Sequence, residues 1–416
     1  MPLIPRQHRP IYTVLLLLLA WHKRRSVPGL VLYVLAVSLP LRIARRLLNV
    51  CKAPPQLDTL TASIVHAIHW ISDGSTYEVK QLLAVLDWIH GFKARWAGAK
   101  MKTVTEEDSS SVRGVWIAEE WKDLEKERLP ECVVLLYIHG GAYCFSGAEY
   151  GAPHHLHLIK SFNALEEKAG SNKRLVVFSL EYPLAPEHAF PAQIPVAADA
   201  FKWLVNSLGV SQIVVGGDSA GAHMTLSLMN HIKNTPELSG LPIQPFATIL
   251  ISPWVSSPSS SSSSSSGEKV CFDSISVRGI QQADRLVFGH LPEKTNNLLT
   301  SVKPDEFHVA TKGTLVLYGG AGILSEGIEK FVGMLESRSV AVPGLEVVKY
   351  DGMPHCFKYV SFEKSHFSGP FDSNPNGHLA RFFFSIMLMD RLYPSVRGKA
   401  LEAVEKTAAF IQRASA

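Results

Sequence analysis

The most constraining feature of the chain is an apolar run that ends in a serine between two glycines. After three β-branched residues at 213–215, the sequence continues Gly216-Gly217-Asp218-Ser219-Ala220-Gly221. β-branched residues favour a strand and the small residues that follow favour a helix, so the pattern predicts strand, sharp turn and helix. The turn needs glycines two residues before and after Ser219, because a Cβ there would collide as the strand bends into the helix. We therefore expect Ser219 to project from the tip of a strained G-x-S-x-G turn.

Two other loops follow strand-like runs. The apolar run 132–138 ends at His139-Gly140-Gly141-Ala142, and the run 345–350 ends at a loop that carries His355. Glycines directly after a strand expose backbone N–H groups, so Gly140, Gly141 and Ala220 are candidate donors to an oxyanion. His355 stands where a general base is expected. Open α/β sheets place their sites at the carboxyl ends of the strands, so these loops should meet around Ser219.

The rest of the chain predicts an α/β fold with a mainly parallel central sheet. Buried strand patterns without polar alternation are separated by helical patterns, which indicates a sheet covered on both faces. We expect further strands at 175–180, 245–251 and 314–318, an edge strand at 115–117, and helices at 150–169, 196–208, 323–337 and 398–413. This domain is expected to span residues 112–416, with a polyserine loop at 256–266 and an insertion at 361–394.

The first 111 residues differ in character from the rest. Residues 1–50 contain apolar runs at 11–21 and 28–41 with basic clusters around them. Each run is shorter than the ~20 residues that a spanning helix needs. A signal anchor, a re-entrant hairpin, an interfacial segment and a helix pair packed on the main domain all fit; we expect a membrane-anchoring segment. Residues 51–111 should form a helical cap, with two amphipathic helices between 57 and 100.

Composition sets limits on the class of protein. The 416 residues are 46% hydrophobic and 19% charged, with a net charge of +4, which fits a globular or membrane-associated enzyme and gives no indication of nucleic-acid binding. The basic excess lies in the N-terminal fifth and suits anionic lipid. The five cysteines are scattered without a C-x-x-C pair, so neither a disulfide framework nor a zinc site is indicated, although a single bridge stays open.

Three motifs occur in an order that resembles a known family. They are the loop 139–142, the segment Glu181-Tyr-Pro-Leu-Ala-Pro-Glu187 and the turn 217–221, and together they resemble the hormone-sensitive lipase family of α/β-hydrolases over roughly residues 112–360. The resemblance implies an α/β-hydrolase fold and a serine carboxylesterase, lipase or deacetylase without metal or organic cofactor. It implies that Ser219 is the nucleophile, His355 the general base and Glu187 a supporting acid. The apolar N-terminus is similar to that of membrane-anchored members such as arylacetamide and fungal sterol deacetylases, which suggests the endoplasmic reticulum or another endomembrane.

The sequence departs from this family at one place. The third residue of the triad, an acid, should follow strand 314–318 by a few positions, and Gly322 stands there. Glu326 is the nearest carboxylate, about one turn into the next helix. Asp351 or another acid is the second possibility, and a site without a functional acid is the third. Loss of the acid costs ~10⁴ in turnover in serine proteases.

The predicted activity is therefore hydrolysis of a hydrophobic ester, with membrane lipid as a second partner. The alternative is a catalytically impaired hydrolase that binds an apolar ligand or acts as a receptor.

Overall fold

A computed structural model describes residues 76–109, 111–256, 273–289, 291, 310, 312–337, 342, 344–357 and 394–416. The predictions for residues 1–50, for the cap up to residue 75, for the polyserine loop after residue 256 and for the insertion up to residue 393 lie outside these ranges. Within them, no helix combines the length and apolar character that crossing a membrane requires.

The described strands form one eight-stranded sheet in the order β1-β2-β4-β3-β5-β6-β7-β8. The six strands from β3 to β8 pair in parallel, while β1 and β2 are antiparallel additions at one side. This confirms the mainly parallel sheet. The strands are β1 (Lys100–Thr103), β2 (Gly114–Ala118), β3 (Val133–Ile138), β4 (Leu175–Leu180), β5 (Gln212–Asp218), β6 (Ala247–Ile251), β7 (Gly313–Gly319) and β8 (Leu345–Tyr350).

The predicted edge strand at 115–117 is in fact an interior strand. β2 pairs with β4 on one side and with the short β1 on the other. Every residue of β2 is buried. In β1 the first two residues are half-buried and the last two are exposed. The polar sequence of β1, Lys-Met-Lys-Thr, gave no strand signal, and its charged residues are typical of an edge that must not pair with another chain.

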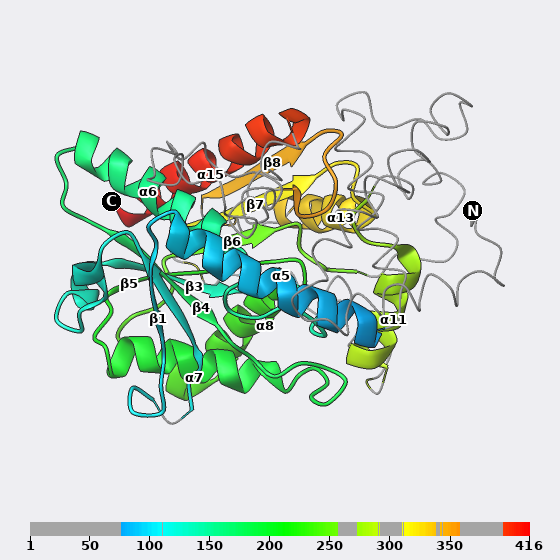
Figure 1. Cartoon of the computed structure of the whole chain (residues 1–416), viewed down its shortest axis with the longest axis horizontal. Helices are drawn as coiled ribbons and strands as arrows, with labels where there is room; N and C mark the ends of the chain where they lie inside the picture. The colour runs from blue at the N-terminus through cyan, green and yellow to red at the C-terminus, as the bar shows by residue number, and fades with distance from the viewer. Residues whose placement is uncertain are drawn as a thin grey trace, which may run out of the picture.

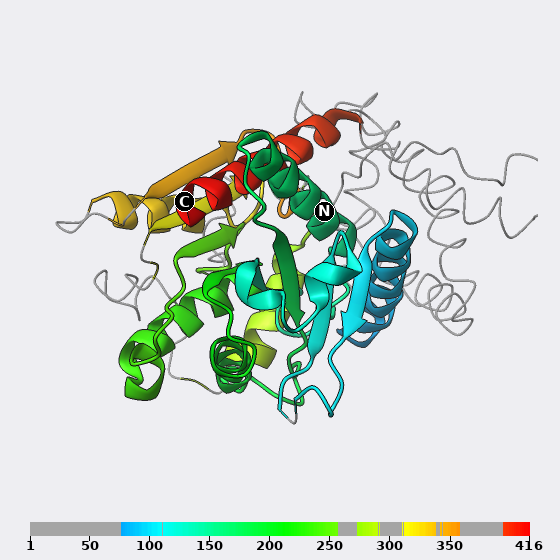
Figure 2. The same cartoon turned by 90° about the vertical axis from the view of Figure 1, so that its left-hand side faces the viewer.

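Helices cover both faces of the sheet (Figures 1 and 2). Helices α6 (Ala152–Lys168) and α15 (Pro394–Ser415) pack together on one face, and α5 (Thr76–Trp96), the described part of the predicted cap, packs on α6. The other face buries residues of α7 (Gln193–Asn206), α8 (Ala220–Asn234), α11 (Val277–Phe288) and α13 (Ser325–Glu336). Three short helices in the described ranges each add a buried leucine to this second face: η3 (Trp121–Leu124), η4 (Leu129–Glu131) and α9 (Pro236–Ser239).

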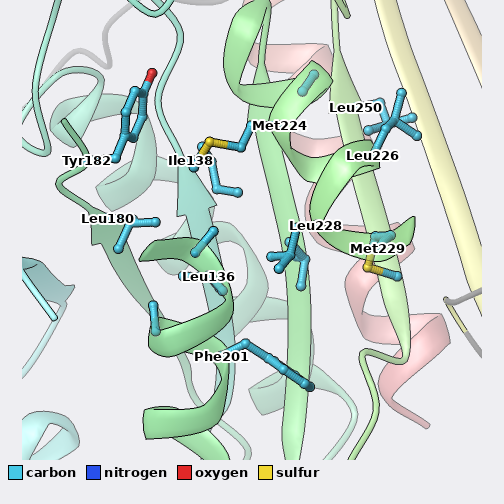
Figure 3. Packing of buried hydrophobic residues seen from close by; sticks show 14 of the residues in the cluster. Leu136, Ile138, Leu180, Tyr182, Phe201, Met224, Leu226, Leu228, Met229 and Leu250 are labelled. Atoms are coloured by element: carbon cyan, nitrogen blue, oxygen red, sulfur yellow. The ribbon is translucent and has the colours of Figure 1, made fainter. Parts of the chain in front are cut away.

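The core consists of two apolar clusters, one on each face of the sheet. In β3, Leu136 and Ile138 belong to the cluster with α7 and α8, while Leu135 and Tyr137 belong to the cluster with α6 and α15. Figure 3 shows Leu136 and Ile138 beside apolar side chains of α8. Because both faces are buried, the strands are continuously apolar, and this is why they were readily predicted.

Candidate active site

The turn after β5 has the strained geometry that its glycines predict. Ser219 has φ 52° and ψ −117°, and α8 begins at the next residue. A Cβ at Gly217 would lie 2.5 Å from the carbonyl oxygen of Ile138, and a Cβ at Gly221 would overlap that same oxygen. The two glycines therefore allow the turn to lie directly against the end of β3, which holds Ser219 in place.

Ser219 contacts His355 through their side chains. Nε2 of His355 lies 2.9 Å from Oγ of Ser219, a hydrogen-bond distance. Both side chains are buried, and each comes from the loop at the carboxyl end of its strand, β5 and β8 respectively. The structure thus brings the predicted nucleophile and the predicted base together.

Asp218, the residue before the serine, connects the three loops of the site. Its Oδ1 accepts hydrogen bonds from the Tyr137 hydroxyl at 2.5 Å and from the Gly140 N–H at 3.1 Å, and its Oδ2 lies 3.7 Å from Sγ of Cys356. A carboxylate with these partners holds two loops against the serine turn (217–221): the glycine loop (139–142) and the histidine loop (351–357).

The three predicted oxyanion donors are not equivalent. The Gly140 N–H donates to Asp218 and is committed to that structural bond. In the described part of the chain, neither the Gly141 nor the Ala220 N–H has an acceptor, and Ala220 is the first residue of α8. The N-terminal end of a helix carries a partial positive charge that favours an anion. Gly141 and Ala220 are thus the donors still available to an oxyanion.

The environment of His355 favours a neutral imidazole. Burial lowers the pKa of His355 below its usual value, and the negative charges of Asp273 and Asp218 oppose this shift without cancelling it. A neutral imidazole whose Nε2 faces a hydroxyl can accept its proton.

The structure does not bring the predicted acids to His355. Glu326 lies in the first turn of α13 with its side chain 58% exposed and paired with Lys330 at 2.8 Å. Asp351 is 80% exposed and pairs with Lys349 at 3.6 Å. Among the described residues, no carboxylate accepts a hydrogen bond from Nδ1 of His355. Glu326 fails because the helix turns its side chain toward solvent.

A carboxylate that the sequence analysis missed lies beside the histidine loop. Asp273 is fully buried, and its two oxygens accept the backbone N–H groups of His355 at 2.8 Å and of Ile323 at 2.5 Å. It lies just before α11, in a stretch that follows the polyserine tract. No periodicity or motif marks this residue, so the sequence carried no signal for it.

Glu187, for which the resemblance implies a supporting role, lies at the surface. Its exposed carboxylate pairs with Lys80 of α5 at 3.2 Å. In the same segment, the Tyr182 hydroxyl donates to the carbonyl of His139 at 2.7 Å and its ring stacks on the His139 ring. These contacts of Tyr182 hold His139, the first residue of the glycine loop, in place.

A metal centre is not apparent in the described ranges, where no group of three His, Cys, Asp or Glu side chains is placed to hold an ion. Cys132, Cys144 and Cys356 form no disulfide among the described residues.

Comparison with known proteins agrees with the fold. A family model described as the α/β hydrolase fold matches residues 135–359, more than half of the chain. The chain therefore belongs to the α/β-hydrolase family.

Curated relatives match over shorter stretches. An esterase of Acinetobacter venetianus is 32% identical over 123 residues, which cover 29% of this chain and 35% of that protein. The arylacetamide deacetylase of Oryctolagus cuniculus is 30% identical over 111 residues, 25% of this chain and 26% of the relative. A 2-hydroxyisoflavanone dehydratase of Glycyrrhiza echinata is 27% identical over 254 residues, 56% of this chain and 71% of the relative. The chain thus spans about a third or less of the first two relatives.

Solved structures share the fold. A bacterial esterase of the hormone-sensitive lipase family has a TM-score of 0.56 at 17% identity, covering 85% of this chain and 97% of that one. The likeness extends across the sheet and its helices and establishes a common architecture.

Proposed function

We propose that this protein is a serine hydrolase of carboxylic esters. The observation that carries the proposal is the 2.9 Å contact between Oγ of Ser219 and Nε2 of His355 at the tip of a strained turn. A hydroxyl paired with an imidazole is the arrangement of nucleophilic catalysis. It favours acyl transfer over the dehydration for which the plant relative is named.

The proposed reaction proceeds through an acyl-enzyme. Nε2 of His355 takes the proton of Ser219 as Oγ attacks the carbonyl carbon, and the N–H groups of Gly141 and Ala220 stabilise the resulting oxyanion. The tetrahedral intermediate collapses, the ester C–O bond breaks, and His355 gives its proton to the departing alcohol. Water, activated by the same imidazole, then attacks the acyl-enzyme; the carboxylic acid leaves and Ser219 regains its proton.

We further propose that the ester is hydrophobic, such as an acetylated sterol, an aryl ester or a medium-chain lipid ester. The names of two relatives, an esterase and an arylacetamide deacetylase, support this class. The apolar character of residues 1–50 supports a substrate that is delivered from lipid.

The catalytic part of this proposal is tested by Ser219→Ala. This variant should lose hydrolysis of a short-chain nitrophenyl ester. The matched control is Ser211→Ala, which removes an exposed hydroxyl that donates to the Pro130 carbonyl at 2.9 Å. Full activity in Ser219→Ala would contradict the proposal.

Membrane association is proposed separately. Residues 1–50 are expected to hold the protein on an endomembrane, and Trp88 and Trp96 of α5 are 58% and 49% exposed, as interfacial tryptophans are. The full-length chain should sediment with the membrane fraction and stay there after a high-salt wash. Recovery in the supernatant before the wash would contradict this part of the proposal.

A further inference from the structure

The catalytic histidine has a carboxylate neighbour that does not come from the expected position. The loop after β7 carries glycine at 322, and a Cβ built there would lie 3.3 Å from the backbone nitrogen of His355 and 3.5 Å from Oδ2 of Asp273. The carboxylate of Asp273 therefore lies next to the place from which a side chain at 322 would start. It reaches this place from the segment before α11.

Asp273 holds the histidine loop by its backbone. Its Oδ1 accepts the N–H of His355 at 2.8 Å, while its Oδ2 accepts the N–H of Ile323, next to the glycine. The neighbouring Ser274 donates its hydroxyl to the carbonyl of His355 at 3.1 Å. The peptide groups on both sides of the His355 Cα are therefore fixed by two successive residues of one segment.

Asp273 also supplies charge. It is fully buried, and both its oxygens accept N–H groups, as an ionised carboxylate does. The structure places two carboxylates around the imidazole, Asp273 from the segment before α11 and Asp218 from the end of β5; both raise the pKa of His355 against the effect of burial. Asp218 is committed to Tyr137 and Gly140, whereas Asp273 contacts the histidine loop itself.

We propose that Asp273 is the positioning residue of His355 and takes over, from a different segment of the chain, the place of the acid that position 322 lacks. This rests on the proposed ester hydrolysis. Asp273 acts through the backbone and the charge rather than through a hydrogen bond to Nδ1. Because residue 322 in the loop 320–323 is a glycine, no side chain at this position occupies the space beside the Asp273 carboxylate.

The first experiment compares Asp273→Asn with the wild-type protein on a short-chain nitrophenyl ester. The amide keeps the size and one acceptor but removes the charge. We expect kcat to fall by about 10²-fold, the effect of a small misplacement of a catalytic group, with KM changed by less than about twofold. The acid limb of the kcat/KM profile should move to lower pH, because a charge that raises the pKa of His355 is gone. Two variants serve as matched controls: Asp351→Asn, four residues before His355, and Glu326→Gln. Both should leave kcat and the acid limb of the pH profile unchanged.

A second experiment returns the acid to its expected place. In Asp273→Asn/Gly322→Asp, a carboxylate again lies beside the histidine loop, and kcat should recover at least about tenfold over Asp273→Asn. In Gly322→Asp alone two carboxylates would crowd one space, so no gain is expected. If Asp273→Asn yields no folded protein, the double variant must restore folded, active enzyme; failure to do so contradicts the proposal.

The two proposals fail in different ways. A wild-type chain that does not react with a fluorophosphonate at Ser219 overturns the proposed function itself. A wild-type chain that reacts, together with an Asp273→Asn variant of unchanged kcat and pH profile, overturns only the role of Asp273. A loss of activity in Glu326→Gln equal to that in Asp273→Asn would also overturn it.

Discussion

Oγ of Ser219 and Nε2 of His355 lie 2.9 Å apart although 136 positions separate the two residues in the sequence. Their strands, β5 and β8, are not neighbours either, because β6 and β7 lie between them in the sheet. The contact arises because all four strands run in parallel and end at the same edge, where their loops meet. The parallel order of the strands therefore brings the two side chains of the site together, through the loops that follow β5 and β8.

The serine turn should not tolerate a side chain at Gly221. A Cβ there overlaps the carbonyl oxygen of Ile138, a backbone atom that cannot move without displacing β3. We expect Gly221→Ala to destabilise the protein by about 1–3 kcal/mol or more and to abolish activity. Gly333→Ala is the control, because a Cβ at this helical glycine meets nothing within 4 Å. It should be neutral or slightly stabilising in urea unfolding; equal effects of the two variants would contradict the account.

Acid should destabilise the protein through His223. This buried histidine pairs with the Tyr143 hydroxyl at 2.6 Å, and burial lowers its pKa from 6.5 to about 3. Between these values the unfolded chain binds a proton that the folded protein does not, so stability falls as the pH falls. The slope for one such group is at most about 1.4 kcal/mol per pH unit. His223→Gln should flatten the pH dependence of the unfolding free energy below pH 6.5, while substitution of the exposed His188 should leave it unchanged. An unaltered slope in His223→Gln would show that this group does not couple to folding.

A rise in pH from 3.8 to about 8 should weaken the attachment of α5 through Asp87. Burial, followed by the charges of Glu181 and Glu149, raises the pKa of Asp87 from 3.8 to about 8. The folded protein therefore holds a proton that the unfolded chain has lost, and stability decreases as the pH rises through this window. Asp87→Asn should make the unfolding temperature less sensitive to pH between 3.8 and about 8, the interval in which only the folded protein holds this proton. Asp199→Asn, a half-exposed carboxylate paired with Lys202, is the control. A wild-type and an Asp87→Asn protein with parallel profiles would contradict the prediction.

The parts of the fold that could be predicted are those determined by residues close together in the sequence. Continuous apolar runs such as 175–180 predicted the strands, because a strand buried on both faces has no polar position. The glycines around Ser219 predicted the turn for a steric reason that the structure bears out. Strand β1 and helix α11 were not predicted. β1 is short and polar, and the apolar positions of α11 that recur at helical spacing, Ile280, Ala283 and Val287, are few and follow a low-complexity tract.

The surroundings of His355 could not be predicted in the same way. Proximity in sequence to the expected slot selected Glu326, yet helix geometry turns that side chain to solvent and toward Lys330. Asp273 is 82 residues from His355 in the sequence and next to a low-complexity tract. It is held near the histidine loop by α11, whose Phe288 packs on His223 and Trp254. Likewise, nothing in the glycine loop indicated that the Gly140 N–H would be committed to Asp218.

The proposed serine hydrolysis is tested most directly by covalent labelling of the full-length protein with a fluorophosphonate, followed by mass spectrometry of its peptides. We expect one adduct per chain on Ser219, absent in Ser219→Ala and formed at least about tenfold more slowly in His355→Ala. Absence of labelling at Ser219 in folded wild-type protein, together with tight binding of an apolar ligand, would contradict the hydrolase and favour a binding protein on the same fold.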